Sequence, residues 1–199
     1  MLIFNIMEVF LFNLEFLFFN LFLAIIAVLF GYLMVRTKSN ILKDLFGFIW
    51  LIFLPNTIYL ITDISHIYED WPRVNFLFKI IIAAQYAIFA IAGIITFIYA
   101  MYFFERMLEN KKSKKRKPST FLAILILNFI VGFGVILGAA QRTNSWYIFT
   151  DPIRVINDSL GVLSSYKLWY TSLIFGIFAN IIYFYFVNKV ISWGKRLKK

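Results

Sequence analysis

The feature of this sequence that most limits its fold is a series of long apolar segments separated by short charged stretches. Each segment approaches or exceeds the roughly 20 residues that a helix needs to cross about 30 Å of hydrocarbon. The chain is 62% hydrophobic and only 15% charged, too few charged side chains to cover a water-facing surface. Spanning strands would be shorter and would alternate. We therefore predict an all-α polytopic membrane helical bundle.

The 199 residues predict a single integral membrane domain with about five transmembrane helices. The opening residues 1–15 are expected to lie in the membrane interface or to insert partially. Because the chain has no cysteine, it has no disulfide, thiolate nucleophile or cysteine metal site, and we expect neither a cofactor nor a metal. The expected spans are 16–35, 45–62, 76–103, 121–140 and 168–190.

The basic residues predict the orientation. Most of the 20 Lys and Arg fall in three stretches, residues 36–43, 106–117 and 189–199, on one side of the predicted membrane. By the positive-inside rule that side is cytoplasmic, so the N-terminus is outside and the C-terminus inside. We interpret Lys111–Lys117 as a topology determinant that also attracts anionic lipid. The alternative is a docking site; no nucleic-acid partner is expected.

Two polar segments match at an offset of 88 residues. The first is Asn56-Thr57-Ile58-Tyr59-Leu60-Ile61-Thr62-Asp63 and the second is Asn144-Ser145-Trp146-Tyr147-Ile148-Phe149-Thr150-Asp151. Asn, Tyr, Thr and Asp coincide, and both segments end outward-going spans. This indicates a possible parallel internal repeat. We call residues 55–63 the first elbow and residues 142–152 the second elbow.

Each elbow carries a signal for a short amphipathic helix on the outer face. Asp151 followed by Pro152 is typical of a helix N-cap with proline at the first helical position, a cap worth about 1 kcal/mol. Asp63 would cap a similar helix in the first elbow. Thr62 and Thr150 would then be structural. The apolar stripe of the second helix would be Ile153, Ile156, Leu160 and Leu163.

The elbows also contain groups that suit a binding site. Pro55 removes a backbone donor within a span, and Asn56 follows it, which leaves two interpretations open. Either Asn56 repairs a kink, or a broken helix lines a polar pocket. Arg142 and Asn144 lie at the matching place, and we expect Arg142 to pair with an acidic neighbour such as Asp63; the alternative is an external phosphate or carboxylate.

Small and amide residues deeper in the spans predict helix contacts. Gly134 and Gly138 form a face that admits another helix, from this chain or a second subunit. Gln85, Asn128 and Asn180 are expected to make hydrogen bonds between helices.

Leu54-Pro55-Asn56 with Thr62-Asp63, and Arg142-Thr143-Asn144-Ser145-Trp146, together resemble a family of bacterial multi-pass membrane proteins, domain of unknown function 1361. The resemblance covers nearly the whole chain and implies a bacterial cell membrane. The family's second motif usually ends in NSWD, whereas here Tyr147 follows Trp146. The resemblance implies no reaction or substrate.

Three functions compete. The first is a non-enzymatic protein whose outward polar pocket binds or moves a small polar or anionic lipid-linked ligand, through Asn56, Asp63, Arg142, Asn144 and Asp151. The second is an enzyme at the outer face that uses Asp63 and Asp151, with His66, Asp70 and Asp158 as further metal ligands or acid/base groups. The third is an accessory subunit of a homo- or hetero-oligomeric complex.

Overall fold

The computed structural model describes the backbone of residues 2–71, 75–109 and 116–196. This part of the chain is helical and contains no strand, which confirms the predicted fold class. The elements are α1 (Leu2–Arg36), α2 (Asn40–Phe53), α3 (Pro55–Thr62), the 3-10 helix η1 (Asp63–His66), α4 (Ile67–Asp70), α5 (Phe76–Leu108), α6 (Pro118–Gln141), α7 (Tyr147–Thr150), α8 (Pro152–Ser164) and α9 (Tyr166–Arg196).

Five helical stretches of the described chain are long and apolar enough to cross a membrane, and each contains one predicted span. The opening residues do not form a separate segment, because α1 is continuous from Leu2. Gln85 on α5 donates to the Phe10 carbonyl at 3.3 Å, so this end of α1 packs on α5. The stretches are Phe10–Arg36, Asn40–His66, Phe76–Leu108, Pro118–Gln141 and Tyr166–Gly194.

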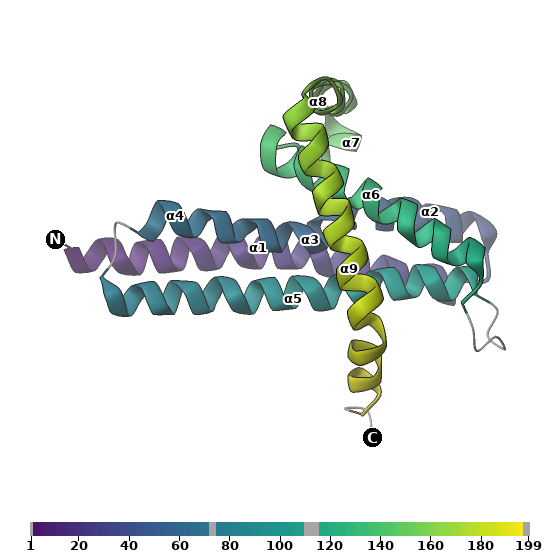
Figure 1. The fold of residues 1–199 in the computed structure, drawn as a ribbon, viewed down its shortest axis with the longest axis horizontal. Helices are drawn as coiled ribbons and strands as arrows, with labels where there is room; N and C mark the ends of the chain where they lie inside the picture. The colour runs from purple at the N-terminus through teal and green to yellow at the C-terminus, as the bar shows by residue number, and fades with distance from the viewer. Residues whose placement is uncertain (1, 72–74, 110–115, 197–199) are drawn as a thin grey trace.

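The spans are not all parallel. α1, α3, α4 and α5 lie along one another, whereas α9 crosses this group steeply, with α6 inclined between them (Figure 1). Successive spans end alternately at two faces of the protein. We call the face with the start of α1, α4 and α8 the N-terminal face. The face with the ends of α1, α5 and α9 and the start of α6 is the basic face, because Arg36, Arg106 and Arg116 lie there.

Glycines explain how α9 approaches α6 so closely. A Cβ added to Gly132 would lie 2.5 Å from the Gly176 nitrogen and from the Ser172 carbonyl oxygen. Only glycine leaves room for the two backbones at this crossing. Beside it, Asn128 donates to the Asn180 side-chain oxygen at 2.9 Å, which confirms the predicted bond between helices.

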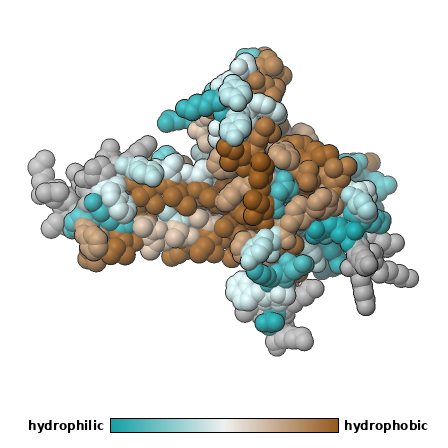
Figure 2. All heavy atoms as spheres, in the orientation of Figure 1, coloured by the Kyte–Doolittle hydropathy of each residue, from teal (hydrophilic) through white to brown (hydrophobic). Residues whose placement is uncertain are grey.

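Two buried apolar clusters hold the helices together. The larger joins α1, α2, α3, α5, α6 and α9 around residues such as Trp50, Phe97 and Tyr183. The smaller, around Leu17, Leu60 and Tyr86, joins α1, α3 and α5, which we call the three-helix arm. Many large apolar side chains remain exposed along the helices, while hydrophilic residues gather toward the ends (Figure 2). Lipid is the solvent that suits this surface.

Candidate functional site

The two elbows meet in the structure. The Asn56 amide donates to Ser145 Oγ at 2.7 Å and to the Phe53 carbonyl at 3.1 Å. Asn56 thus bonds both the Phe53 carbonyl, two residues before Pro55, and the second elbow. Of the two interpretations of Pro55, this pattern fits the repaired kink. Asn144, next to Ser145, accepts the Tyr147 N–H at 3.0 Å through its backbone carbonyl.

The glycine face of α6 explains this contact. A Cβ on Gly134 would lie 2.5 Å from Pro55 Cγ, and one on Gly138 would lie 3.0 Å from Tyr59 Cε2. Both glycines thus admit side chains of α3, so the partner of this face is internal. The resulting register places Arg142, four residues beyond Gly138, near the level of Asp63, four residues beyond Tyr59.

Asp63 does not cap a helix, and that prediction is wrong. Its backbone is helical (φ −59°, ψ −22°), and α3 runs through η1 into α4 instead of ending. The first elbow consequently has no separate surface helix, and α4 follows the line of α3 (Figure 1). The Asp63 side chain is only 1% exposed and accepts a hydrogen bond from Asn20 of α1 at 2.9 Å. The Asp63 side chain therefore bonds Asn20 of α1 instead of a backbone N–H of its own helix.

The second elbow has the local structure that its sequence favours. Asp151 breaks the helix (φ −151°, ψ 67°), and its side chain accepts the Arg154 N–H at 3.1 Å, with Pro152 at the start of α8. The stripe of α8 points away from the protein, since its residues are 54–70% exposed. This exposure fits a helix lying at a lipid interface. The stripe residues are Ile153, Ile156, Leu160 and Leu163.

The elbows therefore match in sequence but not in backbone. Thr62 and Thr150 do behave alike, because each hydroxyl bonds a carbonyl one turn earlier, at 2.7 Å to Tyr59 and 3.3 Å to Trp146. The aspartates differ, since Asp63 lies inside a continuous helical run and Asp151 lies at a break. Asp63 is buried and Asp151 is exposed, so the two do not share one environment.

Arg142 has an unusual backbone. It ends α6 in the left-handed region (φ 54°, ψ 36°), the only non-glycine residue of the described chain with positive φ. Glycine or asparagine usually occupies this position, because a Cβ there costs about 1 kcal/mol. The Arg142 side chain is exposed. The ion pairs found in the described part of the chain are Arg116–Glu105 and Arg154–Asp158, so the expected acidic partner of Arg142 is not found there.

Other groups at the second elbow are already engaged. Arg154 lies 3.6 Å from Asp158 and 4.5 Å from the centre of the Tyr147 ring. Asp158 also accepts the Thr143 hydroxyl at 2.5 Å. Arg142, unlike Arg154, has no ion-pair partner among the described residues. The Arg142 guanidinium and the Asp63 carboxyl both lie within electrostatic reach of the Tyr59 hydroxyl.

The sequence reasoning missed the polar interior of the three-helix arm. Asn13 and Asn20 are 5% and 6% exposed, and their spacing of seven residues puts them on one face of α1. Gln85 of α5 is also buried, and its hydrogen bond to the Phe10 carbonyl of α1 confirms the bond between helices that was predicted for it. Asparagines at this spacing in an apolar span are a signal that could have found this line of polar groups.

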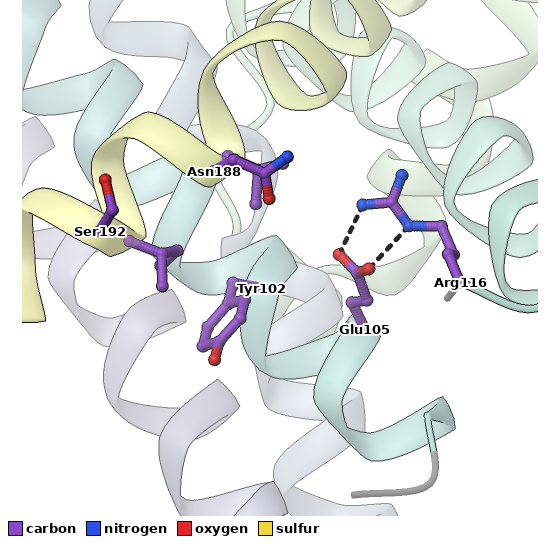
Figure 3. Close-up of a pocket in the computed structure, with 7 residues that line it drawn as sticks. Tyr102, Glu105, Arg116, Asn188 and Ser192 are labelled. Atoms are coloured by element: carbon purple, nitrogen blue, oxygen red, sulfur yellow. Dashed lines mark hydrogen bonds and ion pairs between the residues drawn. The ribbon is translucent and has the colours of Figure 1, made fainter. Parts of the chain in front are cut away.

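A second polar cluster, also missed, lies at the basic face. Arg116 Nε and Nη2 bond both Glu105 oxygens, at 2.6 and 3.0 Å, and the Tyr183 hydroxyl donates to Glu105 Oε2. Beside them is a pocket of about 240 Å³ (Figure 3). Glu109 accepts the Lys117 backbone N–H, which holds the pKa of Glu109 below its usual value. The pocket is lined by Tyr102, Glu105, Arg116, Val187, Asn188, Ile191 and Ser192.

Within the described residues, no group of three or more His, Asp or Glu side chains could hold a metal ion. The side chain of Asp70 and the Lys111–Lys115 part of the basic stretch lie outside the residues that the structure describes.

The fold and these buried polar groups define a polytopic helical membrane protein. The family model described as Protein of unknown function (DUF1361) matches residues 19–182, and the chain belongs to this family. That match includes both elbows, Asn20 and Arg116, but not the end of α9. Comparison with curated proteins and with solved structures found no match.

Proposed function

We propose that this protein binds a small phosphate-type anion, free or as a lipid headgroup, at the junction of the two elbows, with Arg142 as the charged group. The observation that carries the proposal is the left-handed backbone of Arg142. A charged residue stands where glycine would be less strained, and no acidic partner is found for it among the described residues. Strain of this kind gathers at functional sites.

The surroundings of Arg142 support an anion site. The elbow is fixed by the Asn56–Ser145 bond and by the packing of Tyr59 on Gly138, so the arginine projects from a rigid base. Guanidinium groups recognise phosphate through two parallel N–H donors. The side-chain amide of Asn144, two residues further on, would add a neutral donor.

The same proposal includes an orientation. We propose that the N-terminal face, with Arg142 and α8, is outside, and that the basic face is cytoplasmic in a bacterial cell membrane. The support is the position of Arg36, Arg106 and Arg116 at the ends of spans on the basic face. The ligand would then arrive from outside or from the outer leaflet.

The test replaces Arg142 by glycine, which keeps the backbone conformation and removes the charge. Binding is measured for a soluble glycerophosphodiester in detergent and for phosphatidylglycerol in lipid nanodiscs. We expect affinity for the true source of the anion to fall about tenfold or more, the effect of losing a charged hydrogen bond. Thermal stability should rise by about 1 kcal/mol because the strain is relieved.

Arg154→Ala is the matched control, because Arg154 has the same charge at the same elbow but is engaged by Asp158 and Tyr147. It should leave binding nearly unchanged. Equal losses in both variants would indicate only surface charge, and no loss in Arg142→Gly would refute the site.

A further inference from the structure

Asp63 is a carboxyl group buried in an apolar region. It lies three residues before the end of its own spanning stretch, Asn40–His66, and its partner Asn20 lies ten residues inside the stretch Phe10–Arg36. Around the pair lies the apolar cluster of the three-helix arm, including Leu17 and Leu60. An ionisable residue buried within a span is expensive and is functional by default.

The hydrogen bonds of Asp63 are too few for an ionised carboxylate. Asn20 donates to Oδ2, and Oδ1 is buried without a hydrogen-bond partner in the described structure. A buried charge with one neutral donor costs several kcal/mol. A protonated carboxyl removes that charge and turns Oδ1 into a donor, and the Asn20 side chain carries a carbonyl oxygen that can accept from it.

We propose that Asp63, held by Asn20, is a proton-binding site, and that its proton is bound together with the anion at Arg142. The coupling to the anion rests on the proposed function, whereas the proton site at Asp63 does not. No bond other than the O–H bond changes: water at the N-terminal face supplies the proton and takes it back. The protein would then bind a proton and an anion as a pair.

Buried polar side chains lie between Asp63 and the N-terminal face. Asn13 lies two turns nearer that face than Asn20, on the same side of α1. Gln85 bonds the Phe10 carbonyl still nearer the end, and its Oε1 is buried without a hydrogen-bond partner among the described residues. Buried amides of this kind can hold the waters that carry a proton.

The register of α3 on α6 links the proton site to the anion site. Pro55 packs on Gly134 and Tyr59 on Gly138, so the next turn brings Asp63 near the level of Arg142. An ionised Asp63 would repel an anion at Arg142, whereas a protonated Asp63 would not. Anion affinity should therefore rise as pH falls.

The pH dependence expected from Asp63 must be distinguished from that of the titratable and charged groups near it. Tyr86 of α5 belongs to the apolar cluster, and Tyr59 of α3, one turn before Asp63, is half-buried. His66 lies one turn beyond Asp63, with its ring edge-on to Phe16 of α1. Arg142 stands at the end of α6. Among the described buried residues of α1, the polar ones are the amides Asn13 and Asn20. His66 is therefore the group whose replacement must be compared with that of Asp63.

Infrared spectroscopy tests the proton site without any ligand. A protonated carboxylic acid has a carbonyl stretch that an ionised carboxylate lacks. The full chain in nanodiscs should show this band near neutral pH, Asp63→Asn should lose it, and Glu105→Gln should keep it. If Asp63→Asn removes no such band at any pH at which the protein stays folded, the proton site is refuted.

Anion binding across pH tests the coupling. The probe is the glycerophosphodiester, whose own charge is constant through this range. Wild type should bind it at least about fivefold more tightly below the midpoint of the infrared band than above it, the lower end of typical coupling between sites. Asp63→Asn should bind tightly at both, and His66→Gln should keep the pH dependence.

The two failures can be told apart. If the infrared band is present but Arg142→Gly binds like wild type, the proposed function falls and the coupling falls with it, while the proton site stands. If anion binding depends on Arg142 but not on pH, or if His66→Gln abolishes the pH dependence, the coupling is refuted and the anion site stands.

Discussion

Two carboxyl groups of this protein, Asp63, which is buried, and Glu105, which is half-buried toward the opposite face, are held in opposite ways. Glu105, toward the basic face, receives two hydrogen bonds from Arg116 and one from the Tyr183 hydroxyl. Asp63, in the three-helix arm, receives one hydrogen bond, from the neutral amide of Asn20. Three hydrogen bonds, two of them from a cation, favour the charged form of a carboxyl group, whereas a single neutral amide favours it much less. The difference teaches that burial alone does not decide what a carboxyl group does.

The positions of the two carboxyls in the fold agree with this contrast. The Glu105 cluster ties the end of α5 to the start of α6 and to α9, so its charge is used to join three helices. The Asp63 pair joins α1 to η1 and leaves one oxygen without a partner in the described structure. We therefore interpret the cluster of Glu105, Arg116 and Tyr183, which we call the Glu105 clasp, as a structural link between helices. We interpret Asp63 as a group that can bind and release a proton.

The largest expected effect is the loss of the clasp. Glu105→Gln removes the charge that Arg116 and Tyr183 both face, so the free energy of unfolding should fall by about 2–3 kcal/mol. Thermal unfolding in detergent measures it. The matched control is Glu109→Gln, since Glu109 lies four residues further and accepts a backbone N–H instead of the half-buried Arg116 guanidinium. That variant should unfold like wild type; a Glu105 variant that does so as well would show that the clasp is not structural.

A smaller effect is expected when the partner of Asp63 is removed. Asn20→Leu fills the same space and deletes one hydrogen bond, which should cost about 1 kcal/mol if Asp63 is neutral. Losing the only donor to an ionised Asp63 would cost about 3–5 kcal/mol. Denaturation of this variant beside Asn180→Leu, which loses an amide pair between α6 and α9, separates the two values. The larger cost for Asn20→Leu would show that Asp63 is charged.

The sequence predicts the features of this fold that depend on neighbouring residues. The apolar runs are a property of local composition, and each predicted span lies inside a spanning helix. The Asp151–Pro152 pair lies at the break before α8 because both its donor and its acceptor are within four residues. The exposed stripe of α8 follows from helical periodicity alone.

The features that the sequence does not predict depend on contacts between distant residues. Thr62–Asp63 looks like Thr150–Asp151, yet its role is decided by Asn20, which is 43 residues away. The steep crossing of α9 depends on the meeting of Gly132 with Gly176. The Glu105 clasp was missed since its partners come from two other helices, and no local spacing marks them.

The contrast between the two carboxyls is tested most directly by comparing Asp63→Asn with Glu105→Gln in one thermal unfolding experiment at neutral pH. The amide of Asp63→Asn supplies the donor that a protonated carboxyl supplies, so this variant should stay within about 0.5 kcal/mol of wild type. Glu105→Gln should be clearly less stable. A loss in Asp63→Asn as large as that in Glu105→Gln would contradict the account, because it would show that the Asp63 charge, like that of Glu105, holds the helices together.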